Sequence, residues 1–163
     1  GRRSGVAVTI LRVPGIYAAD RAGGDPRERV RRGMPVLVPA DDVYTNHVHA
    51  DDLARACIAA LHRGRPQRIV HVCDDGTLTM GEHFDLVADL SGLPRPRRIT
   101  REQAERELSP MTLSFLAESR RLDNRRLKLE LKLRLRYPTV REGLAGAPPA
   151  AEPAPPFTSV AAP

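Results

Sequence analysis

The feature that most constrains this chain is a short apolar run near its start, Val6–Val13, which Pro14-Gly15 closes. The run is rich in β-branched residues, and this composition predicts a buried strand of a parallel sheet that ends in a loop. Ligands bind in the loops that follow the carboxyl ends of such strands. The residues after Val13 are therefore the first candidates for a binding site.

A second pattern predicts an amphipathic helix that begins at Asp51. Apolar residues recur every four positions, with alanines beside them: Leu53, Cys57 and Leu61, then Ala56 and Ala60. Asp51 and Asp52 fall in the first turn, where unpaired backbone N–H groups and the helix dipole favour negative charge. Gly64 and then Pro66 end the pattern. Helix capping is therefore the favoured role of the two aspartates, ahead of catalysis.

The remaining elements are predicted from local signals. We expect a strand at 68–73, an extended segment at 35–39 and a helix or turn at 27–33. Three helix starts are marked by capping spacings or by proline at the first helical position: Thr79-x-x-Glu82, Thr100-x-x-Gln103 and Ser109-Pro110. Residues 128–136 alternate charged and leucine side chains, which is a strand period, whereas 123–130 also tolerates a helix.

Composition narrows the class of protein. The 163 residues suffice for one domain with a core, although aromatic residues make up only 4% and tryptophan is absent. The net charge of +6 would permit an acidic partner, but the basic residues are interspersed with acidic ones and lack interleaved aromatic rings. We therefore expect no nucleic-acid binding. No membrane span or leader is seen, and a cytoplasmic setting is expected.

The two cysteines carry no metal or disulfide signal. Cys57 and Cys73 lie 16 residues apart without a Cys-x-x-Cys motif or paired histidines at metal spacing. Both are interpreted as small buried hydrophobic residues. His47-x-His49 followed by Asp51 suggests a metal site, yet no third cluster of ligands accompanies them. No metal is expected.

Two segments together resemble the extended short-chain dehydrogenases/reductases, in particular the NAD-dependent epimerase/dehydratase group. They are Arg12-Val13-Pro14-Gly15-Ile16-Tyr17 and Asn46-His47-Val48-His49-Ala50-Asp51-Asp52-Leu53. The resemblance implies an α/β fold: the C-terminal part of a doubly wound, Rossmann-like parallel sheet plus a small, mostly helical substrate-binding subdomain, over residues 1–144. It also favours a helix to about Leu131 and extended chain over 133–138. Residues 145–163, rich in proline and alanine, are expected to be a disordered tail.

The resemblance assigns the turn after the first strand to the cofactor. It implies that Pro14, Gly15, Ile16 and Tyr17 lie against the nicotinamide of NAD or NADP. Physically, proline fixes φ and glycine lets the backbone come close, so main-chain groups can hold a flat ring. Spacing alone favours a strand-terminating turn without a ligand.

The resemblance also places three residues on the substrate side. Arg21 follows the cofactor turn and offers a planar fork for a phosphate or carboxylate. Asn46 and His47 belong to a segment that lines the substrate cleft in the family. The implied substrate is a small molecule, either a nucleotide-sugar or another carbonyl or alcohol compound.

The groups that would carry the chemistry are missing from the sequence. The family's glycine-rich dinucleotide loop and its Tyr-x-x-x-Lys pair occur nowhere in the 163 residues. No catalytic residue is therefore assigned, and the chain is expected to be inactive without the N-terminal half of the same fold. Two alternatives stay open: a stand-alone, non-catalytic binding or assembly domain, and a truncated reading frame without a function of its own.

Overall fold

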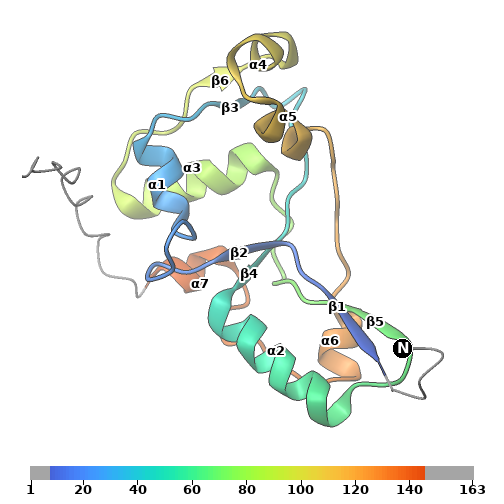
Figure 1. The fold of residues 1–163 in the computed structure, drawn as a ribbon. Helices are drawn as coiled ribbons and strands as arrows, with labels where there is room; N and C mark the ends of the chain where they lie inside the picture. The colour runs from blue at the N-terminus through green and yellow to red at the C-terminus, as the bar shows by residue number, and fades with distance from the viewer. Residues whose placement is uncertain (1–7, 146–163) are drawn as a thin grey trace, which may run out of the picture.

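The computed structural model describes residues 8–145, which form an α/β fold of short parallel strands and helices (Figure 1). The strands are β1 (Thr9–Arg12), β2 (Gly15–Tyr17), β3 (Val36–Leu37), β4 (His47–His49), β5 (Arg68–His71) and β6 (Arg98–Ile99). The helices are α1 (Pro26–Arg31), α2 (Ala50–Arg63), α3 (Met80–Ser91), α4 (Arg101–Glu107), α5 (Pro110–Leu116), α6 (Arg125–Leu129) and α7 (Val140–Ala145). The predicted tail lies outside the described residues, except for Ala145, which ends α7.

The first strand changes its partner at Pro14. β1 pairs in parallel with β5, whereas β2 pairs in parallel with β4. Proline has no N–H to donate to a ladder, and the pairing resumes at Gly15, whose N–H donates to the carbonyl of Asn46 over 3.3 Å. The predicted strand does end before Pro14, at Arg12, but a second paired strand follows from Gly15. The prediction that the first strand is buried was wrong within the described residues, because Ile10 is 48% exposed.

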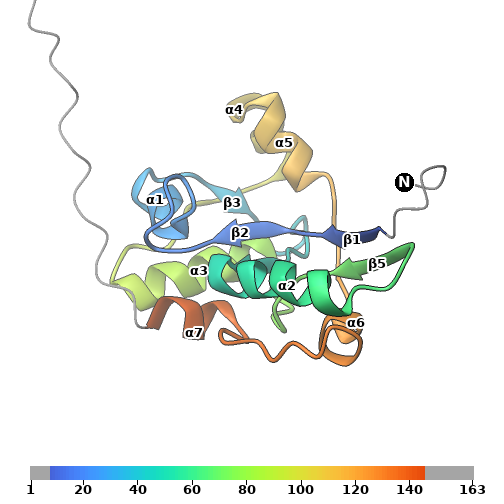
Figure 2. The ribbon, with the colours of Figure 1, turned by 60° about the horizontal axis from the view of Figure 1, so that its bottom comes forward.

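Apolar side chains pack in three clusters. The first joins α2, β4 and β5 to α6 and to Leu131–Leu135. The second joins β2 and β3 to α3 and α7, and the third holds α4 and α5 against β3 and β6. In Figures 1 and 2, α4 and α5 stand away from the part built on β1, β2, β4 and β5. The subdomain of β3, β6, α4 and α5 therefore has a core of its own.

Helix α2 buries only part of the predicted face: Ala56 is buried, and Leu53 and Ala60 pack against the first cluster. Its buried residues are Asp52, Ala56 and Ala59, whereas Cys57 is exposed and Leu61 is 85% exposed. Small side chains at the buried positions let the helix lie close to the strands. Ile58 and Leu61 are exposed, and Cys57 is not the buried hydrophobic residue that the sequence predicted.

Asp52 ties the start of α2 to the C-terminal segment. Its fully buried carboxylate accepts hydrogen bonds from the backbone N–H groups of Arg136 and Tyr137 at 2.8–3.0 Å. Arg55 adds an ion pair of 2.6 Å. The helix itself is capped by His49, whose Nδ1 accepts from the N–H of Asp51. The predicted capping role of the aspartates is thus taken by His49, and Asp52 instead joins two distant segments.

The capping spacings are confirmed. Thr79 with Glu82 and Thr100 with Gln103 form reciprocal capping boxes, and Ser109 caps α5. These local signals need only residues within one turn of the chain, which is why sequence spacing finds them.

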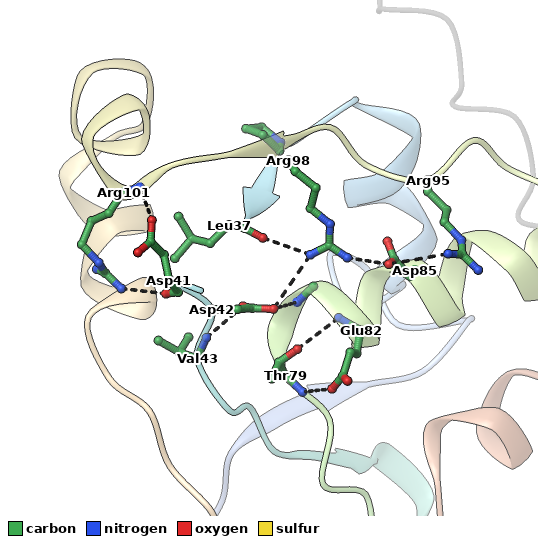
Figure 3. Close-up of polar contacts among 12 residues, drawn as sticks. Leu37, Asp41, Asp42, Val43, Thr79, Glu82, Asp85, Arg95, Arg98 and Arg101 are labelled. Atoms are coloured by element: carbon green, nitrogen blue, oxygen red, sulfur yellow. Dashed lines mark hydrogen bonds and ion pairs between the residues drawn. The ribbon is translucent and has the colours of Figure 1, made fainter. Parts of the chain in front are cut away.

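A network of charged residues attaches the subdomain to α3 (Figure 3). Arg98 on β6 donates to the carbonyl of Leu37 over 3.0 Å and to Asp85 on α3 over 2.5 Å. Asp42 accepts from the N–H groups of Val43 and Gly81, each over 2.9 Å. A Cβ at Gly81 would collide with the guanidinium of Arg98. Glycine at position 81 therefore lets α3 approach this network.

Replacing Asp52 with alanine should destabilise the fold strongly. The change leaves the N–H groups of Arg136 and Tyr137 without their acceptor and removes the partner of Arg55, so we expect a loss of about 3–5 kcal/mol in the free energy of unfolding. The control Asp51→Ala alters an exposed neighbour and should cost about 1 kcal/mol or less. Urea denaturation measures both, and equal losses would contradict the role given to Asp52.

Candidate functional site

The structure places the predicted cofactor residues on β2. Pro14 is half-buried and Gly15 is exposed, so main chain is accessible at this point. Ile16 packs against the cluster that contains Val48. A Cβ at Gly15 would come within 3.1 Å of the His47 ring, so glycine allows β2 to lie close to that side chain. Pro14 and Gly15 are the open part of the predicted cofactor turn.

Tyr17 is a core residue. Its side chain is 3% exposed, its hydroxyl donates to the carbonyl of Thr139 over 3.4 Å, and its ring meets the edge of His49 at 5.2 Å. Burial raises the pKa of the hydroxyl above its ordinary value. Only the main chain of Tyr17 is therefore placed to take part in the predicted cofactor contact.

The three predicted substrate residues have different surroundings. Arg21 is exposed in the turn after β2, and its carbonyl accepts from the N–H of Gly24 over 2.8 Å. Asn46 is buried and its Oδ1 accepts from the N–H of Leu122 over 3.1 Å, so its side chain connects two segments of the fold. His47 is paired in register with Gly15 across β2 and β4. The structure thus brings His47, but not the amide of Asn46, to the open turn.

His47 forms a stacked pair with His83 of α3. The ring centroids are 3.8 Å apart and the planes differ by 13°. Shielding from water lowers the pKa of His47 to about 4, and burial together with the neighbouring His47 lowers that of His83. Near neutral pH both imidazoles are uncharged, so the pair offers hydrogen-bonding nitrogens without adding positive charge.

Sequence analysis did not single out His83. Nδ1 of this histidine is buried and has no hydrogen-bond partner among residues 8–145. In the sequence it lies beside Phe84 on the apolar face of a helix, where nothing distinguishes it from an ordinary core residue. Its relation to His47 depends on how α3 packs against β4.

The described histidines and acids do not gather into a metal centre. Within residues 8–145, no group of three or more His, Cys, Asp or Glu side chains is arranged to hold a metal ion. His49, one of the residues that had suggested a metal, caps α2 through its Nδ1. In the same range, no helix has the length and apolar content needed to cross a bilayer.

The N-termini of the two longest described helices are not open to a phosphate. A pyrophosphate binds at a helix N-terminus through free N–H groups and the positive end of the dipole. His49 caps the first turn of α2, which also carries the carboxylates of Asp51 and Asp52. The N-terminus of α3 is closed by the Thr79–Glu82 capping box. Neither helix therefore supplies the pyrophosphate site of a dinucleotide.

No protein-family model and no curated protein matches the chain, but solved structures do. A conserved protein of unknown function from Silicibacter pomeroyi is 32% identical, with a TM-score of 0.71 over 84% of this chain and 46% of its own. A nucleoside-diphosphate-sugar epimerase from Pseudomonas aeruginosa is 23% identical, with a TM-score of 0.71 over 89% and 48%. UDP-glucose 4-epimerase from Thermotoga maritima is 21% identical, with a TM-score of 0.64 over 90% and 46%.

The chain has the fold of the C-terminal part of an epimerase/dehydratase-type, Rossmann-like domain. The predicted fold class is thereby confirmed. The chain spans less than half the length of each of these three structures. Within this epimerase/dehydratase fold, the roles of Pro14–Tyr17, Arg21, Asn46 and His47 stay predictions.

The lowered pKa of His47 predicts its titration. The His47 imidazole resonance should titrate with a midpoint near pH 4, compared with an ordinary value of 6.5. Because the unfolded chain takes up this proton first, the contribution of His47 to stability is complete above about pH 6.5 and falls as the pH drops toward 4. NMR titration measures the midpoint, with His47→Gln assigning the resonance.

A matched control for this titration is His62→Gln, which alters an exposed histidine of α2. It should leave the His47 midpoint unchanged. A midpoint of His47 at 6 or above would show that the stacked pair is not shielded as described.

Proposed function

We propose that this chain is the C-terminal, substrate-binding portion of an NAD(P)-dependent oxidoreductase of the epimerase/dehydratase type. Its substrate would be a nucleotide-sugar or a related alcohol or ketone. Structures of similar fold support the ligand classes: the Thermotoga maritima epimerase was solved with UDP-glucose, MoeE5 with UDP-glucuronic acid and NAD, and a human epimerase family protein with NADPH. The proposal covers both NAD and NADP.

The observation that carries the proposal is the free edge of β1. Within the described residues, β1 pairs only with β5. Val8, Ile10 and Val13 along it are 37–48% exposed. A parallel strand is normally paired and covered on both faces, and an open apolar edge invites association. A second α/β unit that adds a parallel strand would satisfy this edge.

The outer face of α2 also indicates that another unit covers this side of the molecule. Ile58 is 58% exposed and Leu61 is 85% exposed, and Cys57 lies beside them. The C-terminal end of this helix adjoins β1, since the Thr9 hydroxyl donates to the carbonyl of Arg65 over 2.9 Å. Exposed apolar groups next to a free strand edge are typical of a surface that another unit covers. We infer that the missing half of the fold is that unit.

The residues present fit one part of the cofactor. The accessible main chain at Pro14 and Gly15 could hold the flat nicotinamide, while exposed Arg21 could bind an anionic group of the substrate. The nicotinamide, when bound, would supply the hydride acceptor or donor. His47 would contribute an uncharged imidazole beside Gly15. These four residues can position ligands, and none of them replaces the absent Tyr-x-x-x-Lys pair.

The chain alone should not retain a nicotinamide cofactor. It lacks the glycine-rich loop, and its two longest described helices have closed N-termini, so the pyrophosphate finds no site. Isothermal titration calorimetry of purified 1–163 with NAD⁺, NADH, NADP⁺ and NADPH should give only heats of dilution. A tight, stoichiometric nicotinamide complex would refute this expectation.

The coding sequence upstream of Gly1 gives the most direct test of the proposal. An in-frame segment with Gly-x-x-Gly-x-x-Gly and Tyr-x-x-x-Lys is expected. A start codon at this point would favour the alternative of a stand-alone binding or assembly domain.

In the longer protein, Ile10→Lys tests whether the edge of β1 is covered. In the chain alone the position is exposed, so the change should be nearly neutral. In the longer protein it should place a charge in an apolar contact and lower the free energy of unfolding by about 2–4 kcal/mol. Leu129→Lys, at an exposed position on α6, is the control and should be neutral in both. Equal, small effects of Ile10→Lys in both proteins would contradict the proposed assembly.

A further inference from the structure

The imidazole of His47 lies between the predicted cofactor turn and a cavity. A Cβ built at Gly15 would come within 3.1 Å of Cδ2 of the ring, so this edge faces the turn. The ring of Tyr17 stands nearly perpendicular to it, with the centroids 6.4 Å apart. His47 also lines a cavity of about 390 Å³ between the loop 74–78, α3 and the start of α7. This volume is within the range of small-molecule sites.

The backbone of His47 is fixed by hydrogen bonds, but its side chain is not. The residue pairs in register with Gly15, and its carbonyl accepts from the N–H of Asp74 over 2.8 Å. Among residues 8–145, the imidazole has ring contacts but no hydrogen bond or ion pair. A histidine ring turns about its Cβ–Cγ bond with broad, roughly two-fold preferences. The orientation of the His47 ring therefore depends on the side chains packed against it.

His83 supplies the contact that covers a face of the His47 ring. The centroids are 3.8 Å apart and the planes differ by 13°, so the two rings lie face to face. Turning the His47 ring about its Cβ–Cγ bond would carry its edge into the face of His83. The stack therefore resists that turn.

His83 is itself held firmly. It is 1% exposed, and its ring meets that of Phe84 edge-on with the centroids 4.8 Å apart. The start of α3, to which it belongs, is fixed by its capping box and by the N–H of Met80, which donates to the carbonyl of Val43 over 2.9 Å. His83 is thus a fixed, flat surface beside His47.

Core packing alone does not account for a histidine at position 83. Leucine and valine are far more common at buried positions on the apolar face of a helix. Nδ1 of His83 has no hydrogen-bond partner among residues 8–145, and a buried polar atom without a partner costs stability. A flat face for His47 accounts for the residue, because leucine and valine do not have one.

We propose that His83 is a positioning residue of the substrate site, whose stacked ring holds the His47 imidazole with its Cδ2 edge toward Gly15. The inference rests on the proposed function, in which His47 is a substrate residue. His83 acts only through His47, since it is itself buried. A neutral imidazole has one donor and one acceptor nitrogen, so the orientation of the ring decides which of them a ligand in the cavity can meet.

NMR of the ¹³C,¹⁵N-labelled chain tests the orientation of the ring without any ligand. The wild type should show a nuclear Overhauser effect (NOE) between Hδ2 of His47 and the Hα protons of Gly15. His83→Leu removes the flat surface and keeps an apolar side chain, so this NOE should be lost. No such NOE in the wild type, or a retained NOE in His83→Leu, would overturn the proposal.

Two further variants separate positioning from general stability. His83→Phe restores a flat ring and should keep the NOE. Val30→Ala trims a buried side chain in the apolar cluster that α1 shares with α3, so it should lower the urea midpoint of unfolding and keep the NOE. Loss of the NOE in either folded variant would overturn the proposal. His83→Met replaces His83→Leu if the latter does not fold, since methionine fills irregular gaps.

The result is separable from that of the proposed function. The NOE is measured without cofactor or substrate, whereas the coding sequence upstream of Gly1 tests the oxidoreductase assignment. Either expectation can fail while the other holds.

Discussion

The buried carboxylate of Asp52 is the interaction on which much of this fold depends. It joins the first turn of α2 to the backbone of Arg136 and Tyr137, 84 and 85 residues later in the chain. The ring of Tyr137 then lies 4.0 Å from that of His49, and Tyr17 donates to Thr139 just beyond. Through this one carboxylate, the start of α2, which follows β4 directly, is joined to the segment that leads into α7.

Local features of the fold could be predicted from the sequence, whereas packing could not. The capping boxes at Thr79 and Thr100 involve residues three apart, and the structure has them as predicted. The buried face of α2 was predicted only in part, because periodicity locates an apolar stripe without telling which neighbour covers it. Here Ala56 meets the strands, and Leu61 is left exposed.

In the candidate site too, the sequence located residues along the chain but did not predict their tertiary contacts. Resemblance selected Asn46 and His47 as substrate residues, and that role stays a prediction. The structure places the amide of Asn46 against Leu122 and the ring of His47 against His83. Neither partner could be derived from spacing, since each lies tens of residues away and meets its counterpart only through tertiary packing. Asp74 is a similar case: the bond from the N–H of Gly76 to its Oδ1 is local, whereas the lack of a donor to Oδ2 among residues 8–145 is a property of the finished fold.

The change of partner at Pro14 puts two ladders on one short segment of the chain. The segment carries the open edge of β1 at Ile10 and, five residues later, the glycine that pairs with His47. A strand that docks on the edge of β1 would therefore lie beside the same segment that sets Gly15 against the His47 ring.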